Sequence, residues 1–144
     1  MSYLLSTGPV ENAAANASIS TWVKVLNNNP TGEVNVEVTV YSLDGEKAQI
    51  SNSSFVVAPM ATEYDVFEIT DVLEYEVEVL LSNEQNVLVS IWGKDADANL
   101  VAAHRFVNNE LSVLGQATED RLPAPKVTSV TVSKKKKINR RRNR

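Results

Sequence analysis

Apolar and polar residues alternate over much of the first 116 residues, and a period of two is typical of a half-buried β-strand. In residues 33–41 every second position is a valine and the positions between are polar; the valines are Val34, Val36, Val38 and Val40. Residues 74–81 repeat this pattern, with Tyr75, Val77, Val79 and Leu81 on one face and Glu74, Glu76 and Glu78 on the other. We expect the apolar faces to line a core and the polar faces to meet water.

Six further segments have the length and composition of short strands, namely 18–26, 54–57, 64–69, 87–92, 100–107 and 111–114. Turn-forming residues separate them, and Asp44-Gly45 is the strongest hairpin signal among these. Seven to eight short strands at spacings of roughly ten residues predict an all-β fold. We expect an antiparallel β-sandwich of immunoglobulin-like or jelly-roll type.

The chain of 144 residues divides into three parts. Residues 1–11 are expected to form an N-terminal arm, which contains the breaker Gly8-Pro9. Residues 12–116 are expected to form the sandwich, which is long enough to fold without metals or disulfides. Residues 117–144 are expected to form a flexible, disordered basic tail.

The composition removes several classes of chemistry. The chain has no cysteine, which excludes disulfides, a thiol nucleophile and thiolate metal sites. Its single histidine, His104, has no Ser-His-Asp spacing around it, so we expect a strand histidine bonded to a neighbour. No apolar run approaches the ~18 residues of a transmembrane helix. We predict a protein that is not an enzyme and uses no cofactor and no metal.

One loop resembles the start of a calcium site. Asp95, Asp97 and Asn99 match D-x-D-x-N, whose oxygens suit a hard cation. Leu100 and Phe106 stand where such a loop needs a glycine and a bidentate glutamate. We therefore expect a polar hairpin turn whose side chains bond nearby backbone groups.

The two tryptophans, Trp22 and Trp92, have two interpretations. Each lies in a strand-like segment on the face opposite the main valine set, where the pair would form an aromatic platform for a sugar or a base. Tryptophan is also common in the core of sandwich domains. We expect core tryptophans and keep the platform as the alternative.

Charge is divided unevenly along the chain. Residues 117–144 contain ten basic and two acidic side chains, a net charge of +8, whereas residues 1–116 contain four basic and sixteen acidic side chains, a net charge of −12. Eight cations fall within the last eleven residues, and they are Lys134, Lys135, Lys136, Lys137, Arg140, Arg141, Arg142 and Arg144. This segment predicts a polyanion anchor. A contact with acidic rows of neighbouring copies, such as Glu74, Glu76 and Glu78, or a solubilising role are alternatives.

The N-terminal arm has a short apolar stretch formed by Tyr3, Leu4 and Leu5. An open sandwich has unpaired strand edges, to which such a stretch can add as an extra strand. We expect these residues to mediate self-association into a homo-oligomer. The alternative is that the arm pairs with its own domain.

Several stretches together resemble small β-sandwich proteins of spore surfaces and spore appendages in endospore-forming Gram-positive bacteria. They are LSTGPV (5–10), VKVLNNNP (23–30), VYSLDG (40–45), WGKDA (92–96) and LVAAHR (100–105). The resemblance covers about 1–115 and implies a structural, often self-assembling module without enzymatic activity. Appendage-forming members cross-link through cysteines in an N-terminal arm, which this chain lacks.

The predicted function is therefore a structural or self-assembling surface protein, of a spore surface layer or appendage, whose cationic tail binds anionic partners. The alternative is a polyanion-binding or nucleic-acid-binding module that acts through the tail, without sequence specificity. A sugar-binding module or a virion decoration protein of the same fold is a third class. The start of the chain lacks the basic and apolar regions of a signal peptide, so we expect synthesis in the cytoplasm and deposition on the spore surface.

Overall fold

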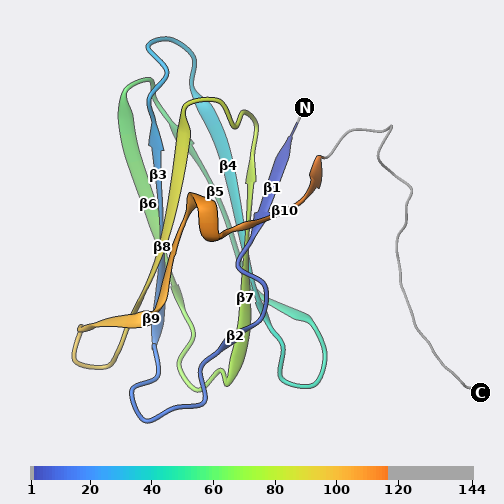
Figure 1. Cartoon of the computed structure of the whole chain (residues 1–144), viewed down its shortest axis with the longest axis vertical. Coiled ribbons are helices and arrows are strands. Elements are labelled where there is room, and N and C mark those ends of the chain that lie inside the picture. The colour runs from blue at the N-terminus through green and yellow to red at the C-terminus, as the bar shows by residue number, and fades with distance from the viewer. Residues whose placement is uncertain (1, 117–144) are drawn as a thin grey trace, which may run out of the picture.

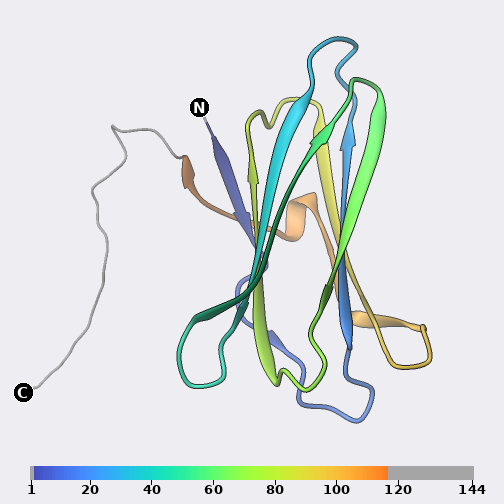
Figure 2. The ribbon, with the colours of Figure 1, turned by 180° about the vertical axis from the view of Figure 1, so that it is seen from behind.

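The computed structural model of the chain describes residues 2–116. They form two antiparallel β-sheets that face each other (Figure 1 and Figure 2). The larger sheet has the strand order β10 (Ser112–Gln116), β1 (Tyr3–Ser6), β7 (Glu74–Leu81), β4 (Val34–Ser42) and β5 (Ala48–Val57), with β2 (Val10–Glu11) also paired to β7. The smaller sheet has the order β6 (Ala61–Glu68), β3 (Ser20–Asn27), β8 (Val87–Lys94) and β9 (Leu100–Val107). The predicted antiparallel β-sandwich is confirmed, and a 3₁₀ turn at Asn108–Glu110 joins β9 to β10.

The core lies between the two sheets and consists mainly of β-branched side chains. The valines expected to face it, Val34, Val36, Val38 and Val40, have exposed fractions of 0–2%. Their neighbours on β7 are equally buried: Tyr75, Val77, Val79 and Leu81. The smaller sheet contributes Val23 and Val25 from β3 and Val89 and Ile91 from β8. The period of two therefore predicted the correct inward face of each of these strands.

The structure has ten strands, where the sequence predicted seven to eight. Part of the difference is β1 and β2, which lie within the segment expected to be an arm. β1 is hydrogen-bonded to β7 on one side and to β10 on the other, so in this structure the segment pairs with its own domain. Leu5 is 2% exposed, which explains the pairing, because its side chain completes the core.

The strand expected at 54–57 begins earlier, at Ala48. β5 is the outer strand of its sheet, so few of its side chains are buried and the alternation that marks an internal strand is weak. The basic tail, residues 117–144, lies outside the described residues.

The register of β4 is tested by two adjacent substitutions. Val36→Asp places an unpaired charge among completely buried valines and should prevent folding, at a cost of several kcal/mol. Glu37→Ala removes an exposed side chain whose carboxylate accepts a hydrogen bond from Asn52 Nδ2 at 3.1 Å, and it should change the free energy of unfolding by about 0.5 kcal/mol or less. Urea unfolding of both variants measures this, and equal effects would show that the register is wrong.

Candidate functional site

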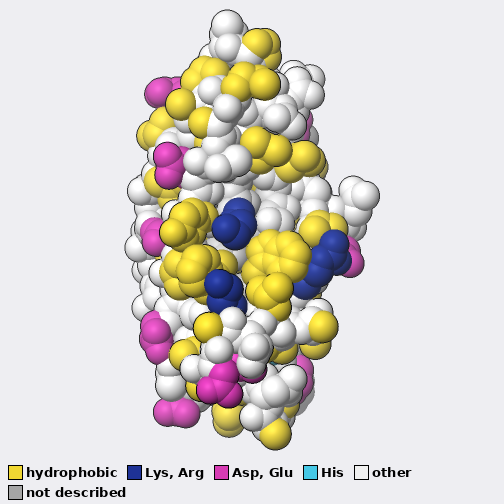
Figure 3. All heavy atoms as spheres, turned by 90° about the vertical axis from the view of Figure 1, so that its left-hand side faces the viewer, with side chains coloured by type: hydrophobic (Ala, Val, Ile, Leu, Met, Phe, Trp, Pro, Cys, Tyr) yellow, Lys and Arg dark blue, Asp and Glu magenta, His cyan; other side chains and the backbone are white. Residues whose placement is uncertain are grey.

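The outer face of the smaller sheet gathers aromatic rings and cations. We call it the aromatic–cation face and define it as Trp22, Lys24, Tyr64, Trp92, Lys94 and Arg105. Figure 3 shows dark-blue basic side chains set among yellow hydrophobic ones on this side of the molecule. Residues 1–116 contain four Lys and Arg residues, and three of them are in this face. An acidic domain thus concentrates its cations on one surface.

One sequence pattern occurs twice in this face, in neighbouring strands. Residues 20–24 (STWVK) in β3 and 90–94 (SIWGK) in β8 both read S-x-W-x-K. The two strands pair antiparallel with Trp22 opposite Trp92, so the pentads lie side by side in opposite directions. Ser, Trp and Lys occupy alternate positions and therefore share the outer face.

Each tryptophan is fixed by a hydrogen bond within its own pentad. The Trp22 Nε1 donates to Ser20 Oγ at 3.0 Å, and the Trp92 Nε1 donates to Ser90 Oγ at 2.9 Å. Both rings are part-exposed on the outer face, so the expectation of core tryptophans is wrong. Burial of the valine face of each strand turns the intervening ring outward. The alternative, an aromatic platform, is the arrangement that the structure has.

The rings and cations of the face pack against one another. The rings of Trp22 and Tyr64 stack with 5.5 Å between their centroids and 14° between their planes. Lys94 Nζ lies 3.9 Å from the Trp22 centroid, and Lys24 Nζ lies 4.7 Å from that of Tyr64. On the other side, the Arg105 guanidinium carbon lies 5.5 Å from the Trp92 centroid. Exposed cation–π contacts contribute roughly 0.5–1 kcal/mol each, so a ligand anion can recruit these side chains at modest cost.

Among the described residues, the two lysines of the face have no acidic partner. Within residues 2–116, neither Lys24 nor Lys94 has a carboxylate within 4.0 Å, whereas Arg105 lies 3.9 Å from Glu110. A hollow of about 250 Å³ lies between the pentads and is lined by Trp22, Lys24, Trp92, Lys94 and Leu100. The face therefore offers two unpaired ammonium groups beside an apolar slot, which suits a ligand that combines negative charge with a flat ring.

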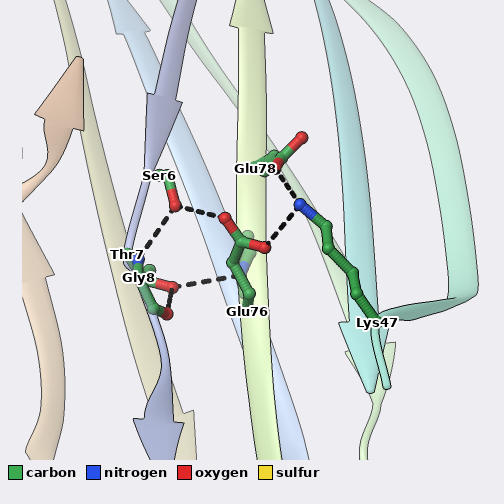
Figure 4. Close-up of polar contacts among 7 residues, drawn as sticks. Ser6, Thr7, Gly8, Lys47, Glu76 and Glu78 are labelled. Atoms are coloured by element: carbon green, nitrogen blue, oxygen red, sulfur yellow. Dashed lines mark hydrogen bonds and ion pairs between the residues drawn. The ribbon is translucent and has the colours of Figure 1, made fainter. Parts of the chain in front are cut away.

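The acidic row of β7 is not a free anionic surface. Lys47, from the β4–β5 hairpin, bridges Glu76 Oε1 at 2.9 Å and Glu78 Oε2 at 2.8 Å (Figure 4). Glu76 also accepts a hydrogen bond from Ser6 Oγ at 2.5 Å. The network links β1 and β7 to the β4–β5 hairpin, so Glu76 and Glu78 already have a cation partner and are less available to bind a basic tail.

Burial affects the protonation of this network. It raises the pKa of Glu78 above its ordinary value, Lys47 lowers that pKa in turn, and the nearby charge of Glu76 raises it. Burial lowers the pKa of Lys47, but its bonds to Glu78 and Glu76 outweigh this effect and the pKa is raised. Because folding raises the pKa of Glu78, ionisation of this group costs stability, and the cost is relieved as the pH falls through the folded-state pKa.

His104 is buried and bonded, as the sequence predicted. Its Nε2 lies 2.7 Å from the carbonyl oxygen of Glu11, and its Nδ1 lies 2.6 Å from Ser18 Oγ. A carbonyl only accepts, so Nε2 donates, and in the neutral ring Nδ1 accepts from the Ser18 hydroxyl. Ser18 is 1% exposed and His104 is 5% exposed, so the pair is shielded from solvent, and its hydrogen bonds tie β9 to the N-terminal segment.

The calcium-like loop is a turn, as predicted. Asp95 Oδ1 accepts hydrogen bonds from the backbone N–H groups of Asp97 and Asn99, both at 2.9 Å. Among residues 2–116, no group of three or more His, Asp and Glu side chains is arranged to hold a metal ion. The described part of the chain also contains no helix long and apolar enough to cross a membrane.

The predicted site residues fall in different places. Tyr3, Leu4 and Leu5 are in β1, inside the larger sheet, and their role in self-association stays a prediction. The eight basic tail residues lie outside the described residues. Sequence reasoning missed the partnership of Lys24, Lys94 and Arg105 with the tryptophans, although the repeated S-x-W-x-K pentad could have indicated it.

Comparisons with known proteins give little further guidance. No protein-family model and no curated protein matches the chain. A solved structure titled "Crystal Structure of Thermotoga maritima 1070" is similar over 78% of this chain and 90% of its own, with 9% sequence identity and a TM-score of 0.43. A similarity at this level supports no functional argument.

The Lys47 network generates a prediction about pH. Lys47→Met leaves Glu76 and Glu78 without their cation, which raises the pKa of Glu78 further and lowers stability at pH 8 by about 1 kcal/mol, because Lys47 is 47% exposed and solvent screens the pair. The variant should therefore gain more stability than the wild type when the pH falls from 8 to 5.5. Urea unfolding at both pH values measures the gain, and Lys24→Met, which removes an unpaired cation, is the control. The same gain in Lys47→Met and the wild type would contradict the proposed role of Lys47.

Proposed function

We propose that the protein is a non-enzymatic binding module that holds an anionic partner on the aromatic–cation face. The observation that supports this most is the pair of S-x-W-x-K pentads, which place side by side two tryptophans and two lysines without an acidic partner among residues 2–116. A domain with sixteen acidic and four basic residues would gain nothing in solubility from this clustering. Part-exposed rings beside cations are a typical surface for recognition.

The broader role remains the one proposed from the sequence, a structural component of a surface layer that binds anionic material. The resemblance to spore-surface and spore-appendage proteins supports that setting and rests on the sequence stretches alone. Within this proposal the basic tail adds a second, sequence-independent attraction for polyanions. The alternative, a polyanion-binding module acting through the tail alone, differs in leaving the aromatic–cation face unoccupied.

The tryptophans make the face directly observable. The chain has only two, Trp22 and Trp92, and both are in it, so intrinsic fluorescence reports on this surface. We expect dextran sulfate to change the fluorescence of the full-length protein in a salt-sensitive manner. Replacing Lys24 and Lys94 together with glutamine should weaken binding by about tenfold per lysine, since a hydrogen bond to a charged group contributes roughly 1.5–3 kcal/mol.

Two controls separate the face from net charge and from the tail. Lys47→Gln removes one positive charge from the other sheet, and after thermal melting has shown that it is folded, its affinity should stay within about twofold of the wild type. A full-length variant with the eight basic residues of 134–144 replaced by glutamine should still give the fluorescence change. Loss of the response in that tail variant, or equal weakening by Lys47→Gln, would place binding elsewhere and overturn the proposal.

A further inference from the structure

The two pentads are related by a local two-fold arrangement. Trp22 lies opposite Trp92, Ser20 opposite Lys94, and Lys24 opposite Ser90. Two ammonium groups lie near the same ring, that of Trp22. Lys24 Nζ is 5.8 Å and Lys94 Nζ is 3.9 Å from its centroid, so the two nitrogens are at most about 9.7 Å apart. The site thus presents two like anion-binding groups around one ring-lined slot. A ligand segment in which one ring lies between two negative charges can contact both ammonium groups at this separation.

The slot continues into a longer groove. A second hollow, of about 630 Å³, lies on the same sheet and shares Lys24 with the slot. It extends along β3 and β8 past Leu26 and Leu88 to the turn after β9, where Asn108 and Asn109 line it. A groove that runs along two strands and passes several rings and polar groups accommodates a linear chain better than a single small molecule.

The chemistry of the second hollow matches a sugar ring. Its apolar lining includes Leu26 and Leu88, the latter 50% exposed, and its uncharged donors and acceptors include Thr62, Ser90 and Asn109. Glu63 also lines it, which disfavours a negatively charged ring at this position. A sugar ring has an apolar C–H face, which packs on apolar and aromatic side chains, and hydroxyl groups, which bond to hydroxyl and amide groups.

The charge of the domain selects among anionic chains. The face has three cations, whereas the rest of residues 1–116 has sixteen acidic side chains and one further cation, Lys47. A chain with a charge on every unit, such as single-stranded nucleic acid, would hold its additional charges against this acidic surface. A chain with a charge on every second ring can pair its charges with the lysines and place uncharged rings between them.

From these observations we infer that the partner is a linear acidic polysaccharide with carboxylates on alternate rings, bound with carboxylates at Lys24 and Lys94 and a ring between Trp22 and Trp92. This inference rests on the binding role proposed above and adds the class of ligand.

The test compares ligands that differ in charge spacing, with the full-length tail variant described above so that only the face is measured. The probes are an octasaccharide of hyaluronate (a carboxylate on every second ring), octagalacturonate (a carboxylate on every ring), oligo(dT) of eight nucleotides and an uncharged oligomer of N-acetylglucosamine. Affinities are measured by calorimetry and by tryptophan fluorescence. We expect hyaluronate to bind most tightly and Lys24→Gln and Lys94→Gln each to weaken it by about tenfold, since each removes one charge-assisted contact. The uncharged oligomer should be affected by neither substitution.

The outcomes separate this inference from the proposed function. Tighter binding of oligo(dT) or octagalacturonate would overturn the inference, and it would leave the binding role intact if the affinity still depends on Lys24 and Lys94. Binding of dextran sulfate without binding of hyaluronate would also overturn the inference and leave the binding role intact. If only one of the two lysine variants weakened the binding of hyaluronate, the inferred placement of a carboxylate at each lysine would be overturned. If neither dextran sulfate nor any of the four probes binds, both the inference and the proposed function are wrong.

Discussion

Val23 and Val25 of β3 are almost completely buried between the sheets, and their burial turns Trp22 and Lys24 outward. Successive side chains of a strand point to opposite faces, so a strand cannot bury both sets against one partner sheet. Burying a valine contributes roughly 1.5–3 kcal/mol, and a one-residue slip would expose the whole valine set. The packing of the core thus creates the outer face and fixes its side chains.

In β8, too, burial of the inner side chains turns the others outward, and here a glycine restricts the inner face further. Gly93 stands between Trp92 and Lys94, and its position faces the buried pair of Ser18 and His104. A Cβ there would lie 2.8 Å from His104 Cβ and 2.3 Å from Ser18 Oγ, so no larger residue fits without displacing the histidine. The buried histidine pair and the surface pentad are therefore parts of one strand geometry. A substitution on the inner side of β8, such as at Gly93, would therefore displace the backbone that positions Trp92 and Lys94.

The sequence predicted the sandwich because the valine alternation in residues 33–41 and 74–81 is strong and belongs to internal strands. It did not predict the length of β5 or the pairing of β1, because the outer strand buries few side chains and the N-terminal strand depends on partners far away in the sequence. For Trp22 and Trp92 the alternation already indicated the outer face, and the general preference of tryptophan for cores was the weaker guide. The contacts of Lys24 and Arg105 with the rings depend on which strands are neighbours, which local patterns do not determine.

The central claim, that the outer face of the smaller sheet is the binding surface, is tested most directly by nuclear magnetic resonance of the ¹⁵N-labelled full-length protein. The two indole N–H signals, from Trp22 and Trp92, report on the face, and the backbone signals of β4 and β7 report on the opposite sheet. On titration with dextran sulfate, we predict that both indole signals and the backbone signals around Lys24 and Lys94 shift together and saturably, while those of β4 and β7 stay in place. Shifts confined to the tail or to the larger sheet would contradict the account.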